Sequence, residues 1–183
     1  MPDADSETKL RLYMLIVNRY KGLISEKENK SISEIRQRVS PYNDFISALK
    51  TRLTGGINHY SYEKHFLQAI QAVLGYLREI HNFEFLLPFW MGFEEIDQLK
   101  AAGPMDKAIL CAALLRSLGS DDCKVYVTKK GNVFVGFKWN KESYIIEPKG
   151  SSMLSGSAAD NIFIGDQLAY IFSDTYFESF EDG

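Results

Sequence analysis

The spacing of apolar residues predicts that the first half of the chain is helical. In residues 6–26 apolar side chains recur every three or four positions, which places them on one stripe of a long helix. Residues 31–54 predict a first turn capped by Ser31 or Ser33 and a break at Pro41. A helix then begins at Asn43 or Asp44 and stops at Gly55 and Gly56. A further apolar stripe predicts a helix over residues 61–80.

The middle of the chain carries the most apolar helical pattern. Residues 103–119, GPMDKAILCAALLRSLG, are apolar nearly all round, so we expect a buried helix at the centre of the fold. After Gly119 the pattern changes to the alternation of strands, and the runs CKVYVT, NVFVGFKW and ESYIIEP predict an antiparallel meander against that helix. Residues 149–160 predict a loop of small residues, and residues 166–177 predict a last strand or short helix.

The order of these elements, helices first and sheet afterwards, is typical of an α+β domain. The chain has 183 residues, 45% of them hydrophobic, which suits one core. We expect an N-terminal helix and polar linker over residues 1–30 and one domain over residues 31–183. Within that domain we expect a helical lobe over 31–102, the central helix over 103–119, and the sheet with a C-terminal segment over 120–183.

Charge and composition exclude several classes of partner. The net charge is -3 and the lysines and arginines are scattered, so the chain lacks the basic patch that nucleic acid requires. Its first residues lack the basic region and long apolar run of a signal peptide or membrane span. We therefore expect a cytoplasmic protein that binds neither nucleic acid nor membrane, with Cys111 and Cys123 as reduced thiols.

The central helix and its surroundings resemble the transglutaminase-like superfamily of prokaryotic type, whose core is papain-like. The family's helix pattern is Cys-x-Asp-x-Ala, then apolar positions, then Leu-Leu-Arg-x-x-Gly. The matching residues here are Asp106, Ala108, Leu114, Leu115, Arg116 and Gly119. The segments SEIRQRVSP and YIIEP also resemble family segments, so the resemblance covers about residues 31–150.

The resemblance implies that the catalytic triad is degenerate. In the family a nucleophilic cysteine begins the buried helix, a histidine lies on a following strand and an aspartate lies near the end of the next strand. These positions fall on Pro104, Asn132 and Glu147 in this chain. Proline offers no thiol, and all three histidines precede the central helix. Pro104 instead makes a sound first helical position, with Gly103 as cap and Asp106 in the first turn.

Cys111 is the cysteine nearest to the missing nucleophile, two turns inside the helix. Backbone N–H groups are already bonded there, and apolar surroundings raise the pKa of a thiol. We therefore interpret Cys111 as a core residue. The alternative is a displaced nucleophile, which requires Cys111 or Cys123 to lie within hydrogen-bond reach of His59, His65 or His81.

Other candidate chemistry is limited to an aromatic segment. In the family the segment before the nucleophile lines the cleft, so the resemblance makes Phe89, Trp90, Phe93 and Asp106 candidate binding residues; the alternative is that the rings belong to the core. The histidines have no accompanying cysteine or acidic cluster, so we expect no metal site. No glycine-rich phosphate loop follows a strand, so we expect no cofactor.

Three functional hypotheses follow. The leading one is a non-catalytic binding or scaffolding module that uses the remnant cleft to bind a protein or peptide partner. The competing one is a divergent cysteine-dependent hydrolase or acyltransferase, of peptidase or amidase type, with a displaced nucleophile. The third makes the helix of residues 6–26 the interface of a homodimer.

Overall fold

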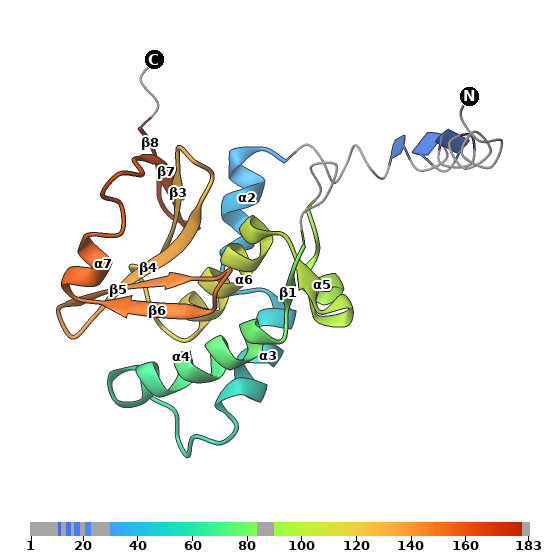
Figure 1. The fold of residues 1–183 in the computed structure, drawn as a ribbon. Helices are drawn as coiled ribbons and strands as arrows, with labels where there is room; N and C mark the ends of the chain where they lie inside the picture. The colour runs from blue at the N-terminus through green and yellow to red at the C-terminus, as the bar shows by residue number, and fades with distance from the viewer. Residues whose placement is uncertain are drawn as a thin grey trace.

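The computed structural model describes residues 11, 14–15, 17–18, 21–22, 30–83 and 90–180 (Figure 1). Two thirds of the helix predicted over residues 6–26 lie outside the described residues; the seven described positions within it are helical, and the homodimer interface assigned to it stays a prediction. Phe89, one of the candidate binding residues, also lies outside them.

The first two helices after residue 30 begin at polar capping residues, in each case one of the two that the sequence offers. Ser31 caps the first of them in a capping box with Glu34, and Asn43 caps the second by accepting a hydrogen bond from the Ile46 amide. The helices are α2 (Ile32–Arg38), α3 (Asp44–Thr54), α4 (Tyr62–Arg78), α5 (Phe93–Leu99) and α6 (Pro104–Ser117). Two short strands, β1 (His81–Asn82) and β2 (Ala101–Ala102), pair in parallel.

The main sheet is antiparallel and has the strand order β6-β5-β4-β3-β7-β8. The predicted meander is confirmed as β3 (Lys124–Thr128), β4 (Val133–Trp139) and β5 (Glu142–Glu147). For residues 166–177 the sequence left a strand or a short helix open, and the structure forms a strand, β7 (Leu168–Phe172), which pairs with β3. The strand β8 (Phe177–Ser179) extends the sheet beyond β7.

The predicted loop over residues 149–160 is wrong. These residues form β6 (Ser152–Ser155) and α7 (Ser157–Asp160), separated by Gly156 at a φ of 56°. β6 pairs with β5 in a register that sets Met153 opposite Ile146, and Met153 packs against the core. The backbone hydrogen bonds to β5 therefore determine that this segment is extended, although its small residues are typical of a loop.

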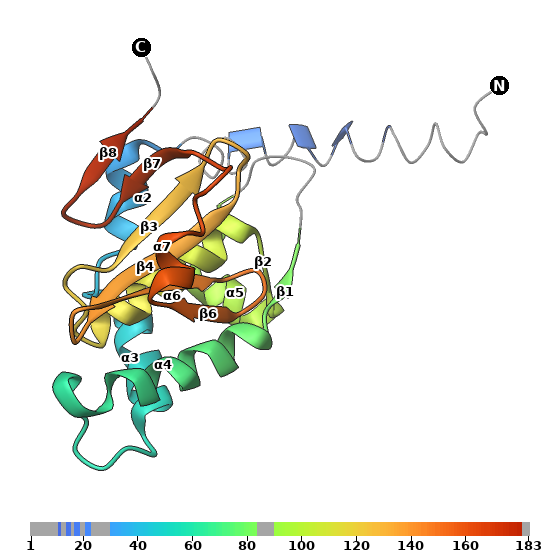
Figure 2. The same cartoon turned by 60° about the vertical axis from the view of Figure 1, so that its left-hand side comes forward.

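The two faces of the sheet have different roles. Alternate residues such as Val135 and Ile146 face the main core around α6, whereas Phe134 and Ile145 face a small cluster with Ala159 on the opposite side. Figure 2 shows α7 over one face and the larger helices over the other. The predicted α+β class is confirmed.

The core is built around α6. Its residues from Ala108 to Leu115 are 0% exposed, and the helix packs against β3 and β4 on one side and against α2, α3 and α4 on others. The all-round apolar pattern of the sequence is thus matched by all-round burial, as predicted.

Gly136 in β4 is a position where the packing requires the absence of a side chain. A Cβ atom there would lie 2.6 Å from Cε2 of Tyr126 and 2.8 Å from Cδ1 of Ile145. We expect Gly136→Ala to lower the free energy of unfolding by about 1–3 kcal/mol, because the neighbours must shift. The measurement is urea-induced unfolding followed by circular dichroism.

The matched control is Gly75→Ala in α4, where an added Cβ meets nothing within 4 Å. Because alanine is the better helix former, this change is expected to raise the free energy of unfolding by up to about 1 kcal/mol. Equal effects of the two substitutions would contradict the packing described for β3, β4 and β5.

Candidate functional site

The first turn of α6 is the place where the family resemblance puts the nucleophile. Gly103 is the N-cap in an extended conformation, Pro104 follows at the first helical position, and Asp106 lies in the first turn, as predicted. Proline fits there because the amide of a first helical residue has no partner within the helix. The position nearest the positive end of the helix dipole therefore carries a half-buried pyrrolidine ring and no ionisable group.

A buried ion pair fixes this first turn. Asp106 is 3% exposed and accepts a hydrogen bond of 3.0 Å from Nη1 of Arg38, while Nη2 of Arg38 donates to the Met91 carbonyl. The Arg38 guanidinium lies 5.5 Å from the ring centroid of Trp90 and 5.4 Å from that of Phe93. The pair thus connects α2, α6 and the aromatic segment, and we name it the Arg38–Asp106 clamp.

The two candidate rings of that segment differ in exposure. Phe93 is 5% exposed and belongs to the core at the start of α5, whereas Trp90 is half-buried.

Burial raises the pKa of the Asp106 carboxyl group, and the charge and hydrogen bond of Arg38 act against that rise. Asp106 is therefore a structural partner of Arg38, without access to a ligand.

Lys107 is a buried charged residue that the sequence analysis missed. It is 1% exposed, and its Nζ donates to the Ile80 carbonyl at 2.9 Å and to Oδ1 of Asn82 at 3.4 Å. Burial lowers the pKa of its ammonium group. The signal was present in the sequence, since a lysine within an otherwise apolar helix needs a buried acceptor.

The structure does not bring Pro104, Asn132 and Glu147 together. Asn132 is exposed, and its Nδ2 donates to Oδ2 of Asp166 at 2.8 Å; Glu147 is also exposed and accepts a 3.5 Å hydrogen bond from Ser152. Their neighbours Val133 and Ile146 pack into the α6 core, so alternation directs Asn132 and Glu147 to the other face of the sheet.

Both cysteines are free and buried. Cys111 and Cys123 are 0% exposed, and the Cys123 thiol makes a weak 3.9 Å contact with the Ala112 carbonyl. Burial raises the pKa of Cys111 to about 12 and that of Cys123 well above its usual value. Neither thiol has the exposure or the depressed pKa of a nucleophile, which agrees with the interpretation of Cys111 as a core residue.

An apolar groove of about 440 Å³ lies beside the first turn of α6. It runs between α2 on one side and strands β7 and β8 on the other, which lie close together in both views (Figures 1 and 2). We name it the α6 groove; its lining residues are Ile32, Ile35, Arg36, Trp90, Met105, Tyr170, Phe172, Phe177 and Ser179. Its volume is that of a small-molecule or side-chain pocket.

Most of these lining residues were missed in the sequence analysis, apart from Trp90. Ile32 and Ile35 are three positions apart on α2, and the alternation in β7 places Tyr170 and Phe172 on one face. Each pattern is visible in the sequence. Their meeting is not, because it depends on β7 and β8 continuing the sheet beyond β3, next to α2.

A second hollow, of about 460 Å³, lies across the outer face of the sheet. Its lining includes Lys124, Lys138, Asp122 and Asp160, and the amide of Lys138 donates to Asp122 at 2.8 Å. Charges of both signs line this hollow, and it lies on the face of the sheet away from α6. The α6 groove is therefore the better candidate site.

No protein-family model matches the chain, and no curated protein matches it either. Among solved structures, the fold is similar to that of LapG from Legionella pneumophila in a calcium-bound form. The two chains are 14% identical, the match covers 84% of this chain and 90% of LapG, and the TM-score is 0.53. This likeness shows the fold alone and agrees with a papain-like α+β core.

Two further tests concern a metal and a membrane. Among the described residues, no group of three or more His, Cys, Asp or Glu side chains is arranged so that it could bind a metal ion. No helix in the described part of the chain is long and apolar enough to cross a bilayer.

The burial of both thiols predicts their reactivity. In the native protein at pH 8, we expect iodoacetamide to modify Cys111 and Cys123 only at the rate of unfolding, because attack requires an exposed thiolate. Addition of 6 M guanidinium should make both react as fast as free cysteine. Mass spectrometry of the alkylated peptides measures each site; rapid native labelling of either cysteine would contradict the buried assignment.

The Arg38–Asp106 clamp predicts a large loss of stability on Asp106→Asn. Removal of the carboxylate leaves the mostly buried Arg38 guanidinium without its partner, which costs about 3–5 kcal/mol in comparable buried pairs. Denaturant unfolding measures the change. The control is Asp121→Asn, whose carboxylate pairs with Arg116 but is fully exposed, and which should leave the unfolding midpoint unchanged. Equal midpoints for the two variants would refute the structural role of the clamp.

Proposed function

We propose that this protein is a non-catalytic binding module of transglutaminase-like ancestry, and that the α6 groove is its binding site. The observation that carries the proposal is the juxtaposition at the start of α6. A proline occupies the first helical position, and the next residue, Met105, lines an apolar groove. Binding thus takes place where the family resemblance puts catalysis.

The chemistry of the groove favours binding over reaction. Seven of its nine lining residues are aliphatic, aromatic or methionine, and none is a cysteine, histidine, aspartate or glutamate. General acid–base or nucleophilic catalysis needs such groups within hydrogen-bond reach of a substrate. An apolar concave surface instead gains free energy by removing apolar area of a ligand from water.

The Arg38–Asp106 clamp supports a preformed groove. It holds the segment at Trp90 against the first turn of α6, so that Trp90 and Met105 line the groove without a prior rearrangement. A preformed pocket avoids the entropic loss of ordering its walls on binding. A cytoplasmic location of this binding module is part of the proposal.

The competing function is a cysteine-dependent hydrolase with a displaced nucleophile, and the papain-like α+β core is the observation that favours it. The full burial and raised pKa values of Cys111 and Cys123 argue against it. Casein and fluorogenic peptide-amide substrates distinguish the two functions. Turnover that Cys111→Ser or Cys123→Ser abolishes would establish the competing function.

Binding to the groove is tested with Nile red, a neutral dye that fluoresces in apolar sites. We expect saturable fluorescence with the native chain, and at least fivefold weaker binding with Trp90→Ala or Met105→Glu, because these changes remove a wall or place a charge in the groove. The control is Tyr42→Ala, which alters an aromatic side chain that is 89% exposed outside the groove.

Circular dichroism must show that each variant is folded at the temperature used. Absence of saturable Nile red fluorescence from the native chain would overturn the proposal. So would equal affinities for native protein, Trp90→Ala and Met105→Glu, since the dye would then bind elsewhere.

A further inference from the structure

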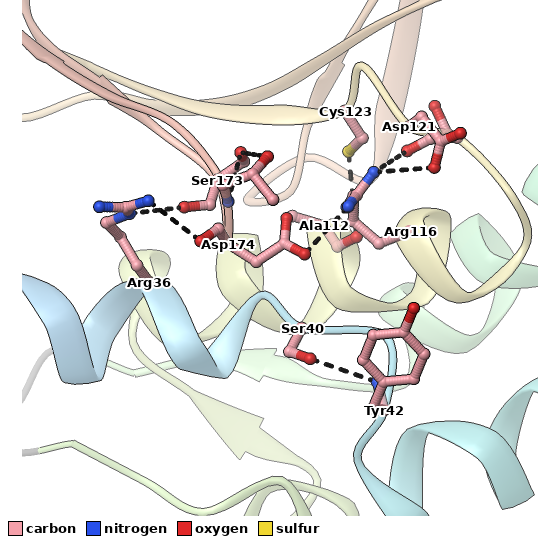
Figure 3. Close-up of polar contacts among 11 residues, drawn as sticks. Arg36, Ser40, Tyr42, Ala112, Arg116, Asp121, Cys123, Ser173 and Asp174 are labelled. Carbon is pink, nitrogen blue, oxygen red and sulfur yellow. Dashed lines mark hydrogen bonds and ion pairs between the residues drawn. The ribbon is translucent and has the colours of Figure 1, made fainter.

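The α6 groove contains one charged lining residue, Arg36. Its Nε donates to the Ser173 carbonyl at 3.1 Å and its Nη2 donates to the Asp174 carbonyl at 3.1 Å (Figure 3). These two bonds fix the guanidinium at the turn between β7 and β8. Its position is therefore defined before any ligand arrives.

No carboxylate among the described residues forms an ion pair with Arg36. Asp174, the residue whose carbonyl Arg36 contacts, directs its own carboxylate to Nη2 of Arg116 at 2.9 Å (Figure 3). Glu34, two residues away on α2, accepts hydrogen bonds from Ser31 in the capping box. Among the described residues, the guanidinium thus has two neutral carbonyls as hydrogen-bond partners, and Arg36 lines an apolar groove.

From this juxtaposition we infer that the groove binds an unbranched alkyl carboxylate, with the alkyl chain among the apolar side chains and the carboxylate on Arg36. A planar guanidinium is the side chain best matched to a carboxylate, and charge-assisted hydrogen bonds are stronger than neutral ones. This inference rests on the proposed function and adds the ligand class.

The lining favours an alkyl chain over a peptide. A peptide carries an N–H and a C=O group at nearly every residue, and each must find a partner or lose free energy on burial. Among its lining side chains, Arg36 and Ser179 are polar, and Tyr170 and Trp90 each add one polar group to an aromatic ring, which is fewer polar groups than a peptide of this length presents. An alkyl carboxylate needs polar partners at one end alone, and its methylene groups match walls such as Ile35, Met105 and Phe172.

The test is competition against Nile red by decanoate, octanoate and 1-decanol. Decanoate should displace the dye at a lower concentration than 1-decanol, which has the same chain without the charge. Octanoate should bind about 15-fold more weakly than decanoate, since each methylene is worth about fourfold in affinity. A hydrogen-bonded charge predicts at least a tenfold preference for decanoate over 1-decanol.

Two variants of Arg36 test the anchor. Arg36→Gln should weaken decanoate at least tenfold and leave 1-decanol unchanged, while Arg36→Lys, which keeps the charge, should restore most of the decanoate affinity. The control is Arg78→Gln: Arg78 also donates to a backbone carbonyl, that of Ser151 at 3.5 Å, but does not line the groove. Its decanoate affinity should equal that of the native chain.

The outcomes separate this inference from the proposed function. Suppose that Nile red binds in the groove but that decanoate and 1-decanol compete equally, or that Arg36→Gln leaves the decanoate affinity unchanged. The inferred ligand class is then wrong, and the proposed binding function of the groove still stands. If N-acetyl-trileucine with a free carboxylate binds ten times more tightly than decanoate, the ligand class is a peptide and the inference is overturned. If Nile red does not bind, both fall.

Discussion

The structure depends on the complete burial of α6. A helix that is apolar on every side must be covered on every side, and the sheet, α2, α3 and α4 together provide that cover. The two charged side chains buried near its start, Asp106 and Lys107, face partners from α2 and from the β1 region. These hydrogen bonds fix α2 and the β1 region against the N-terminal end of α6, where the α6 groove lies.

This arrangement is the basis of the proposal that the protein binds a ligand without thiol catalysis. In such a fold the free amides and dipole at the helix start stabilise a thiolate. Here Pro104 occupies that position and has no ionisable group. The clamp between Arg38 and Asp106 preserves the geometry of the turn, and Trp90 and Met105 present apolar surface beside it. The proposed function thus combines a papain-like α+β fold with an apolar surface at this turn.

Much of the fold could be predicted from local patterns. The caps at Ser31 and Asn43, the proline start of α6 and the meander of β3, β4 and β5 each follow from residues close in sequence. β6 was missed because its small residues are as typical of a loop as of a strand. Its extended conformation depends on the pairing with β5, which the local sequence does not reveal. Tertiary pairing overrode local preference there.

The candidate site was less accessible to the sequence. Trp90 was identified, but the other walls come from α2, α6, β7 and β8. The helix α2 precedes β7 and β8 by more than a hundred residues, so these walls meet only in the fold. The sequence also could not show on which face of the sheet the triad positions inferred from the resemblance would lie. Asn132 and Glu147 are adjacent to residues that face α6, and the two-residue alternation of the strands turns their own side chains away.

The central claim is that ligands bind beside the first turn of α6, and the methionine methyl groups report on it directly. Met105 lines the groove, whereas Met153 lies on β6 at the opposite edge of the sheet. Titration of decanoate into protein labelled with ¹³C at its methionine methyls should shift the Met105 resonance progressively and leave that of Met153 in place. A shift of Met153 with Met105 unmoved would contradict the account.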